Sequence, residues 1–133
     1  MRKTTILALI VIGLLSTAQP MSAMEIMPAT LEAGLQRTSL SEDDIYLIAE
    51  RYPEAKVAWH GRITGYQDPG KEPVQDEFEG CDWDRLIFLD DRYQVTCKRY
   101  HYHYSYRPEA VLLKTGSRYY LYLNRYFYEV RIR

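Results

Sequence analysis

The chain lacks the short motifs that mark the common enzyme classes. It has no G-x-S-x-G, no H-E-x-x-H and no glycine-rich phosphate loop. It also has no free cysteine beside a histidine, as a thiol nucleophile would need. The remaining enzyme hypothesis is a secreted ribonuclease-like hydrolase, in which a Glu base, a His acid and arginine clamps act on a phosphodiester. The spacing of residues does not single out such a Glu and His, so we expect a protein without catalysis.

Long hydrophobic runs are also scarce, and the single clear one lies at the start. Arg2 and Lys3 precede an apolar run, Ile6–Leu15, which small residues follow. The run is about half of the ~20 residues that a membrane-spanning helix needs, so we predict a signal peptide over residues 1–23. Cleavage after Ala18 and after Ala23 are both compatible with the pattern, and an uncleaved anchor is the alternative. The predicted location is the periplasm or the exterior of the cell, with no membrane span after cleavage.

The chain has only two cysteines, Cys81 and Cys97, and in an exported protein we expect them to be paired. The apolar stretches Leu86–Leu89 and Tyr93–Thr96 flank Asp90–Arg92, whose composition is typical of a hairpin turn. Folding that hairpin brings the two cysteines together. A loop of this length gives a disulfide about 3 kcal/mol of stabilisation in the chain-entropy estimate. A redox role would favour the closer C-x-x-C spacing.

Residues 24–133 are enough for one domain, and 47% hydrophobic with 14% aromatic residues excludes a disordered chain. Ser41 followed by three acids predicts a helix that Pro53 ends near Arg51. We expect an extended lead-in over Met24–Arg37 and a loop over Gln67–Gly80. One strand is predicted before the hairpin, over Lys56–Tyr66. Three more are predicted after it, over Ala110–Lys114, Arg118–Leu123 and Tyr126–Ile132. The fold class is therefore mainly β, a small antiparallel barrel or curved sheet of five to six strands with one N-terminal helix.

Tyrosine is abundant, with 13 in the chain against three phenylalanines. Four of them alternate with polar residues and share one face of a predicted strand over residues 99–107: Tyr100, Tyr102, Tyr104 and Tyr106. Because phenylalanine is scarce, we expect these rings to fill the barrel core. The alternative is an exposed platform, since a tyrosine offers an apolar face and a hydroxyl tip to a sugar or a peptide.

Two histidines, His101 and His103, lie two residues apart and project from one face of the same predicted strand. With His60 as a third ligand they make a zinc or copper site conceivable, although H-x-H alone is a weak signal. We expect no cofactor.

Charge is divided along the chain. Residues 24–91 carry 16 acids and 6 bases, whereas residues 92–133 carry 9 bases and 2 acids. The candidate basic face consists of Arg99, Arg107, Arg118 and Arg125. We expect these arginines mostly to pair with the acids of the first part, leaving a small patch for an anionic partner.

The run from Phe78 to Pro108 carries F-E-G-C-D-W-D-R, V-T-C and a Y-x-Y-x-Y repeat before Arg107. It resembles small exported bacterial proteins of uncharacterised function, over about a quarter of the chain. The resemblance implies a shared disulfide-bearing β-domain and brings no activity with it. Small size, the expected disulfide, abundant tyrosine and the absence of catalytic motifs instead favour a binding or interaction module, an envelope-associated accessory or inhibitor-like protein. Its partner would be an envelope protein, a polysaccharide or an anionic lipid surface, and no nucleic acid is expected.

Overall fold

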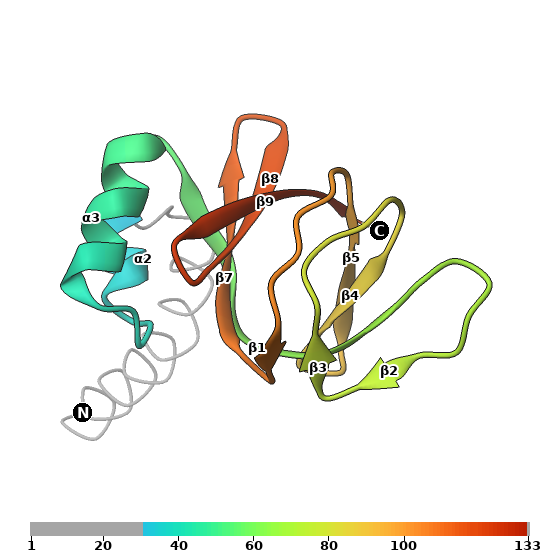
Figure 1. Ribbon diagram of the computed structural model, residues 1–133. Coiled ribbons are helices and arrows are strands. Elements are labelled where there is room, and N and C mark those ends of the chain that lie inside the picture. Colours follow the sequence, from blue (N-terminus) through green and yellow to red (C-terminus); the bar gives the residue numbers. More distant parts are fainter. Residues whose placement is uncertain (1–30, 133) are drawn as a thin grey trace, which may run out of the picture. The chain divides into compact units, whose positions relative to one another are not determined.

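A closed antiparallel β-barrel forms the centre of the computed structural model, which describes residues 31–132 (Figure 1). The predicted signal peptide, residues 1–23, lies outside this described part. The helices are α2 (Leu31–Leu35) and α3 (Glu42–Arg51). The strands are β1 (Lys56–Gln67), β2 (Val74–Gln75), β3 (Glu77–Phe78), β4 (Leu86–Leu89), β5 (Tyr93–Cys97), β6 (Ser105–Tyr106), β7 (Glu109–Thr115), β8 (Arg118–Leu123) and β9 (Tyr126–Ile132).

Six strands close the barrel in the order β1-β4-β5-β9-β8-β7, and β7 pairs back to β1. Strand β1 makes this closure possible because its first half pairs with β7 and its second half pairs with β4. The register shifts between Ile63 and Gly65, where Gly65 has φ 156° and a Cβ would meet the carbonyl oxygen of Val74 at 2.4 Å. This irregularity at Gly65 curves the strand between its two neighbours. The short strand β2 adds to the outer edge of β1.

A two-residue turn joins the last two strands, β8 and β9. Asn124 and Arg125 both have positive φ, 50° and 64°, as a hairpin connection that follows the twist of its strands requires. Asp90 and Asp91 adopt the same left-handed region between β4 and β5, so the predicted hairpin turn there is confirmed.

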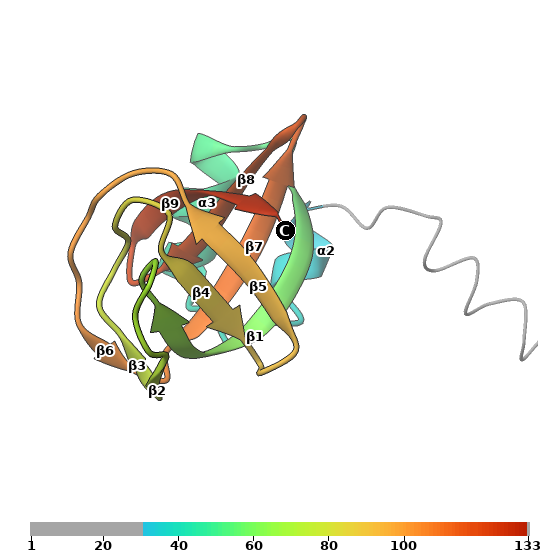
Figure 2. The same ribbon diagram turned by 90° about the vertical axis from the view of Figure 1, so that its right-hand side faces the viewer.

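The helical part covers one outer face of the barrel (Figures 1 and 2). Ser41 caps α3 through a capping box: its hydroxyl accepts the amide N–H of Asp44, whose carboxylate accepts the amide N–H of Ser41. The predicted helix and its end at Arg51 are confirmed. The predicted extended lead-in is wrong over Leu31–Leu35, which form α2, and its part over residues 24–30 lies outside the described residues. Buried Leu31 and Leu35 pack against the neighbouring elements there, so tertiary burial holds a short helix that has no clear period in sequence.

The hydrophobic residues form two separate clusters because β7 and β8 are buried on both faces. The barrel interior holds one cluster, which includes Leu112, Leu121, Phe78 and both cysteines. The second cluster lies under the helices: Leu31, Leu35, Ile48, Ala55, Val111, Leu113 and Tyr122. Alternate side chains of β7 and β8 therefore point into the barrel interior and toward the helices, and contribute to both clusters.

Candidate binding surface

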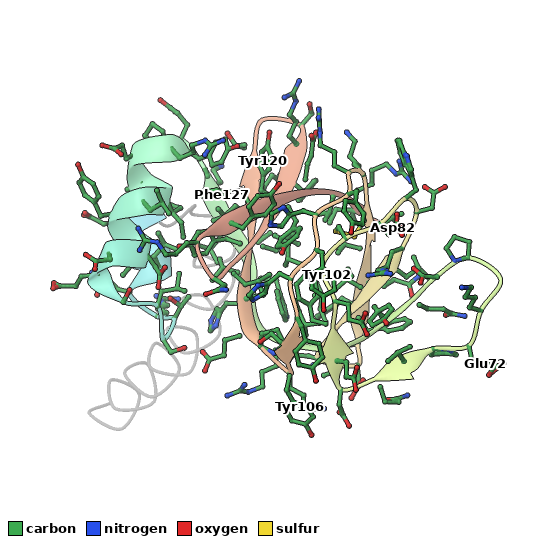
Figure 3. The ribbon with its side chains drawn as sticks, viewed as in Figure 1. Glu72, Asp82, Tyr102, Tyr106, Tyr120 and Phe127 are labelled. Atoms are coloured by element: carbon green, nitrogen blue, oxygen red, sulfur yellow. A yellow bond between two sulfur atoms is a disulfide. The ribbon has the colours of Figure 1, made fainter. Side chains whose placement is uncertain are left out.

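The four alternating tyrosines, hereafter the tyrosine strip (Tyr100, Tyr102, Tyr104 and Tyr106), lie on the outside of the molecule. Their exposed fractions are between 50% and 68%, and the residues between them are half-buried. The predicted alternation is confirmed, but the expectation that these rings fill the core is wrong. The core is built instead from aliphatic residues of the barrel strands together with Phe78 and tyrosines from β1, β8 and β9. Figure 3 shows Tyr102 and Tyr106 on the face turned to the viewer.

The strand predicted over residues 99–107 is wrong except at Ser105–Tyr106, which form β6. The segment that carries the strip lies outside the barrel, which explains its exposure. After Cys97 the chain leaves the barrel and runs beside the segment that contains β3, as Figure 2 shows on its left side. Backbone hydrogen bonds join Cys81 to His101 in both directions, and β6 pairs with β3. With one neighbouring segment and the barrel beneath it, alternate side chains point inward and outward.

A close backbone approach fixes this pairing. Gly80 has φ 80°, and a Cβ at this position would lie 2.0 Å from the carbonyl oxygen of His101. Glycine is therefore required where the two segments meet. The predicted loop Gln67–Gly80 is wrong in part, since it contains β2 and β3, which dock on β1 and β6.

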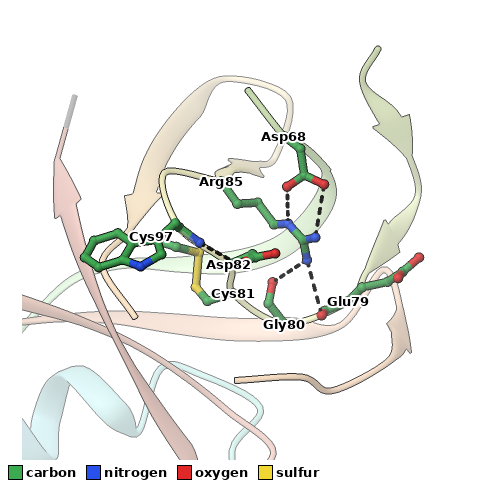
Figure 4. The surroundings of a disulfide bond; sticks show 8 residues. Asp68, Glu79, Gly80, Cys81, Asp82, Arg85 and Cys97 are labelled. Carbon is green, nitrogen blue, oxygen red and sulfur yellow. Dashed lines mark hydrogen bonds and ion pairs between the residues drawn. A yellow bond between two sulfur atoms is a disulfide. The ribbon is translucent and has the colours of Figure 1, made fainter. Parts of the chain in front are cut away.

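The predicted disulfide is confirmed: Cys81 and Cys97 are bonded and almost fully buried. The bond ties the start of the strip segment to the segment that it runs beside. Figure 4 shows an anchor next to it that the sequence did not indicate. The buried guanidinium of Arg85 donates to both carboxylate oxygens of Asp68 and to the carbonyl oxygens of Glu79 and Gly80.

This anchor holds the backbone on which the strip segment docks. Its guanidinium also lies 4.3 Å from the ring centroid of Tyr66. Burial lowers the pKa of Arg85, but its hydrogen bonds to Asp68 outweigh this and the pKa is raised overall. A charge-assisted, bidentate pair of this kind orders both of its partners.

The histidines of the candidate metal site are not brought together. His101 and His103 do share one face, but they point inward: His101 stacks on Tyr126 with ring centroids 3.6 Å apart, and His103 accepts from the side-chain amide of Asn124 at 2.8 Å. His60 lies exposed on β1, at the position opposite Val111. Within residues 31–132, no group of three or more His, Cys, Asp or Glu is placed to hold a metal ion.

The predicted basic face is only partly neutralised. Arg107 pairs with Asp76, as the charge division predicts, but Arg99 pairs with Glu129 at 3.3 Å, an acid of its own part of the chain. Arg118 and Arg125 are exposed and belong to none of the ion pairs of the described residues. Pairing between the two parts is therefore real but incomplete.

One cleft collects part of this charge at the end of the strip. An inner cavity of about 220 Å³ and an open outer depression of about 760 Å³ share four lining residues, so they form one hollow, hereafter the cationic cleft. The shared residues are Arg99, Arg118, Tyr126 and Glu129. The inner part is also lined by Arg51, Tyr52, His101, Tyr120, Phe127 and Tyr128, and the outer part by Trp83, Lys98 and Tyr100.

Glu129 is the one acid of the cleft lining, and two cations already hold it. Its carboxylate, 13% exposed, accepts from Lys98 at 3.1 Å and from Arg99 at 3.3 Å. The hydrogen bond from Lys98 is the largest cause of its lowered pKa, and burial opposes it. With Lys98, Arg99, Arg51 and Arg118 facing one carboxylate, the cleft carries an excess of positive charge.

Aromatic rings form the rest of the wall. The guanidinium of Arg51 lies 5.3 Å from the centroid of Phe127 and 5.7 Å from that of Tyr52, and Tyr52 stacks on Tyr120 with centroids 4.6 Å apart. Figure 3 shows Tyr120 and Phe127 close together. An arginine held on ring faces is ordered before a ligand arrives.

Sequence reasoning found Arg99, Arg118 and Tyr100 but missed Trp83, Arg51 and Glu129. Arg51 ends a helix and Glu129 lies on a strand far from it in sequence, and they line one cleft because the helices pack on the outer face of the barrel. In comparisons with protein-family models, curated proteins and solved structures, nothing matches this chain. No helix of residues 31–132 is long and apolar enough to cross a membrane.

Proposed function

We propose that the protein is an exported binding module, without catalysis, that holds an extended polysaccharide of the cell envelope along the tyrosine strip. The observation that carries this proposal is the row of four exposed tyrosines on one extended segment. Alternate residues of a fully extended chain are roughly 6.6 Å apart, so about 20 Å is the upper limit for the length of the row. A row of this kind suits a linear polymer better than a single small ligand.

The chemistry of the rings supports a sugar. Each tyrosine offers a flat apolar face to a sugar ring and a hydroxyl to the sugar's own hydroxyl groups. Exposed Trp83, at 69%, adds a fifth ring beside Tyr100 in the outer cleft. The signal-peptide pattern and the disulfide support an oxidising compartment outside the cytoplasm.

Affinity electrophoresis through gels that contain soluble polysaccharides tests the proposal. We expect the wild-type protein to be retarded by at least one polymer, and the double variant Tyr102→Ala/Tyr104→Ala to run as in a gel without polymer. Tyr46→Ala is the matched control, because Tyr46 is also more than half exposed, at 67%, but lies on α3. Equal retardation of wild type and double variant contradicts the proposal, and retention only by an envelope protein would assign the strip to a protein partner.

A second candidate, phosphodiester hydrolysis, is favoured by one observation: Glu129, His101 and three arginines line the same cleft. Those are the residue types of the ribonuclease-like hypothesis. The lowered pKa and two ion pairs of Glu129 make it a weak base, which argues against turnover. Cleavage of a fluorogenic RNA that disappears in Glu129→Gln would establish this second candidate.

A further inference from the structure

The cationic cleft has no role in the proposed function of the tyrosine strip, although it is continuous with the strip. Tyr100 belongs to both, since it is the first ring of the strip and part of the outer wall of the cleft. A polymer that lies on the strip therefore reaches Arg99 and Arg118. The two surfaces form one path along the molecule.

We infer that the cationic cleft is a subsite for the carboxylate of an acidic sugar, so that the ligand of the strip is a uronic-acid-type polysaccharide. This inference rests on the proposed function. Arginine side chains bind a planar carboxylate in a two-pronged fashion, and neither Arg51 nor Arg118 has a carboxylate within ion-pair distance among residues 31–132.

The size of the inner cavity agrees with one sugar unit. At about 220 Å³ it lies below the roughly 300–1,000 Å³ that drug-sized ligands occupy. Its wall offers ring surface from Tyr120, Tyr126 and Phe127 next to the guanidinium groups. An acid group carried on a ring satisfies both halves of this lining.

Other polyanions fit less well. A polyphosphate has no apolar ring face for the strip to stack on. A single-stranded nucleic acid has both phosphate and rings, but it is not the expected partner outside the cytoplasm, the location that the signal-peptide pattern and the disulfide favour. Charge complementarity in the cleft and ring stacking along the strip together favour the acidic sugar chain.

The test compares two chains that differ only in charge. Binding of an oligogalacturonate is measured by titration calorimetry against its carboxyl-reduced counterpart, which keeps the same sugar rings. We expect the acidic chain to bind at least tenfold more tightly at 50 mM salt, and the difference to shrink as salt screens the charges. Polyphosphate, single-stranded DNA and anionic lipid vesicles are the competing probes.

Variants locate the effect. We expect Arg118→Gln and Arg51→Gln each to remove most of the preference for the acidic chain, measured as the ratio of the affinities for the acidic and the neutral chain. Arg92→Gln is the matched control, because Arg92 is exposed on the turn between β4 and β5 and lies outside the cleft. Tyr102→Ala should weaken both chains.

The outcomes distinguish the carboxylate subsite in the cleft from the proposed polysaccharide binding by the strip. Equal binding of acidic and neutral chains overturns the carboxylate subsite and leaves the proposed function standing. Binding of neither chain overturns the assignment to a uronic-acid-type polysaccharide, and the gel assay with other polymers then decides the proposed function separately. Tighter binding of polyphosphate, DNA or vesicles, or a preference that survives in Arg118→Gln, overturns the assignment of the cleft to an acidic sugar.

Discussion

Two groups of tyrosines in this molecule have the same chemistry and opposite environments. Tyr120, Tyr122 and Tyr128 are at most 9% exposed, whereas the strip tyrosines are at least 50% exposed. In both groups the tyrosines recur at every second residue, so their spacing in the sequence does not distinguish buried tyrosines from exposed ones. What separates them is the number of neighbours: β8 and β9 each pair on two sides within the barrel, while the strip segment pairs with one short segment outside it.

A row of alternating tyrosines therefore indicates a binding function only where the fold leaves its outer face uncovered. On β8, both faces are covered, one by the barrel interior and the other by the helices. The outward ring of Tyr122 is therefore structural. The outward rings of the strip meet solvent and are available to a partner.

The largest expected effect is a loss of stability when a buried tyrosine is removed. Tyr122 is fully buried beneath α2 and α3, so Tyr122→Ala leaves a cavity and should cost about 3–5 kcal/mol in the free energy of unfolding. Urea denaturation followed by circular dichroism measures it. A cost below about 1 kcal/mol would mean that the helices do not depend on this ring.

The disulfide comes next. Reduction, or the double variant Cys81→Ala/Cys97→Ala, should lower the free energy of unfolding by about 3 kcal/mol, as for a loop of this length. The strip should loosen first, because Cys81 also pairs with His101 through backbone hydrogen bonds. Hydrogen exchange over residues 98–106 checks this, and uniform loosening of the barrel would contradict it.

A smaller effect concerns the hydroxyl of Tyr122, which donates to the carboxylate of Asp44 at the start of α3. Burial acts to raise the pKa of Asp44, but the hydrogen bonds from Tyr122 and Ser41 outweigh it and the pKa lies below 3.8. A lowered folded-state pKa stabilises the fold above pH 3.8, and this contribution is lost as the pH falls through the folded value.

Tyr122→Phe should therefore cost about 1–2 kcal/mol at neutral pH, the range for a hydrogen bond to a charged group. The gap between variant and wild type should narrow below pH 3.8. Thermal unfolding at several pH values measures the gap. A gap that stays constant down to pH 2 would show that the bond does not depend on the charge of Asp44.

Most of the fold could be predicted from the sequence because local signals agree with it. The capped helix from Ser41, the hairpin at Asp90 and the strands Arg118–Leu123 and Tyr126–Ile132 follow from cap, turn and period, and the structure has all of them. The disulfide followed from the hairpin. The lead-in was predicted wrongly, since the short α2 depends on burial of Leu35 in the second cluster.

The candidate site was less accessible to sequence reasoning. Alternation correctly placed the strip tyrosines on one face, but only tertiary structure decides whether that face is covered. Arg51 and Glu129 line the same cleft because α3 packs on the outer face of the barrel, and no local pattern records that packing. The same holds for Arg85 and Asp68, which are 17 positions apart and bind across two loops.

The smallest stability effect and the clearest functional one should coincide at the strip. Tyr102→Ala removes a ring that is 58% exposed, so the free energy of unfolding should change by no more than about 0.5 kcal/mol, as at other surface positions. Binding of the polysaccharide should nevertheless weaken about tenfold, since stacking of a ring on an apolar partner face contributes on the order of 1–1.5 kcal/mol. Urea denaturation and calorimetry on the same preparation measure both quantities. If Tyr102→Ala cost 3 kcal/mol in stability, the strip would belong with the buried tyrosines of β8 and β9, and the contrast between the two groups would disappear.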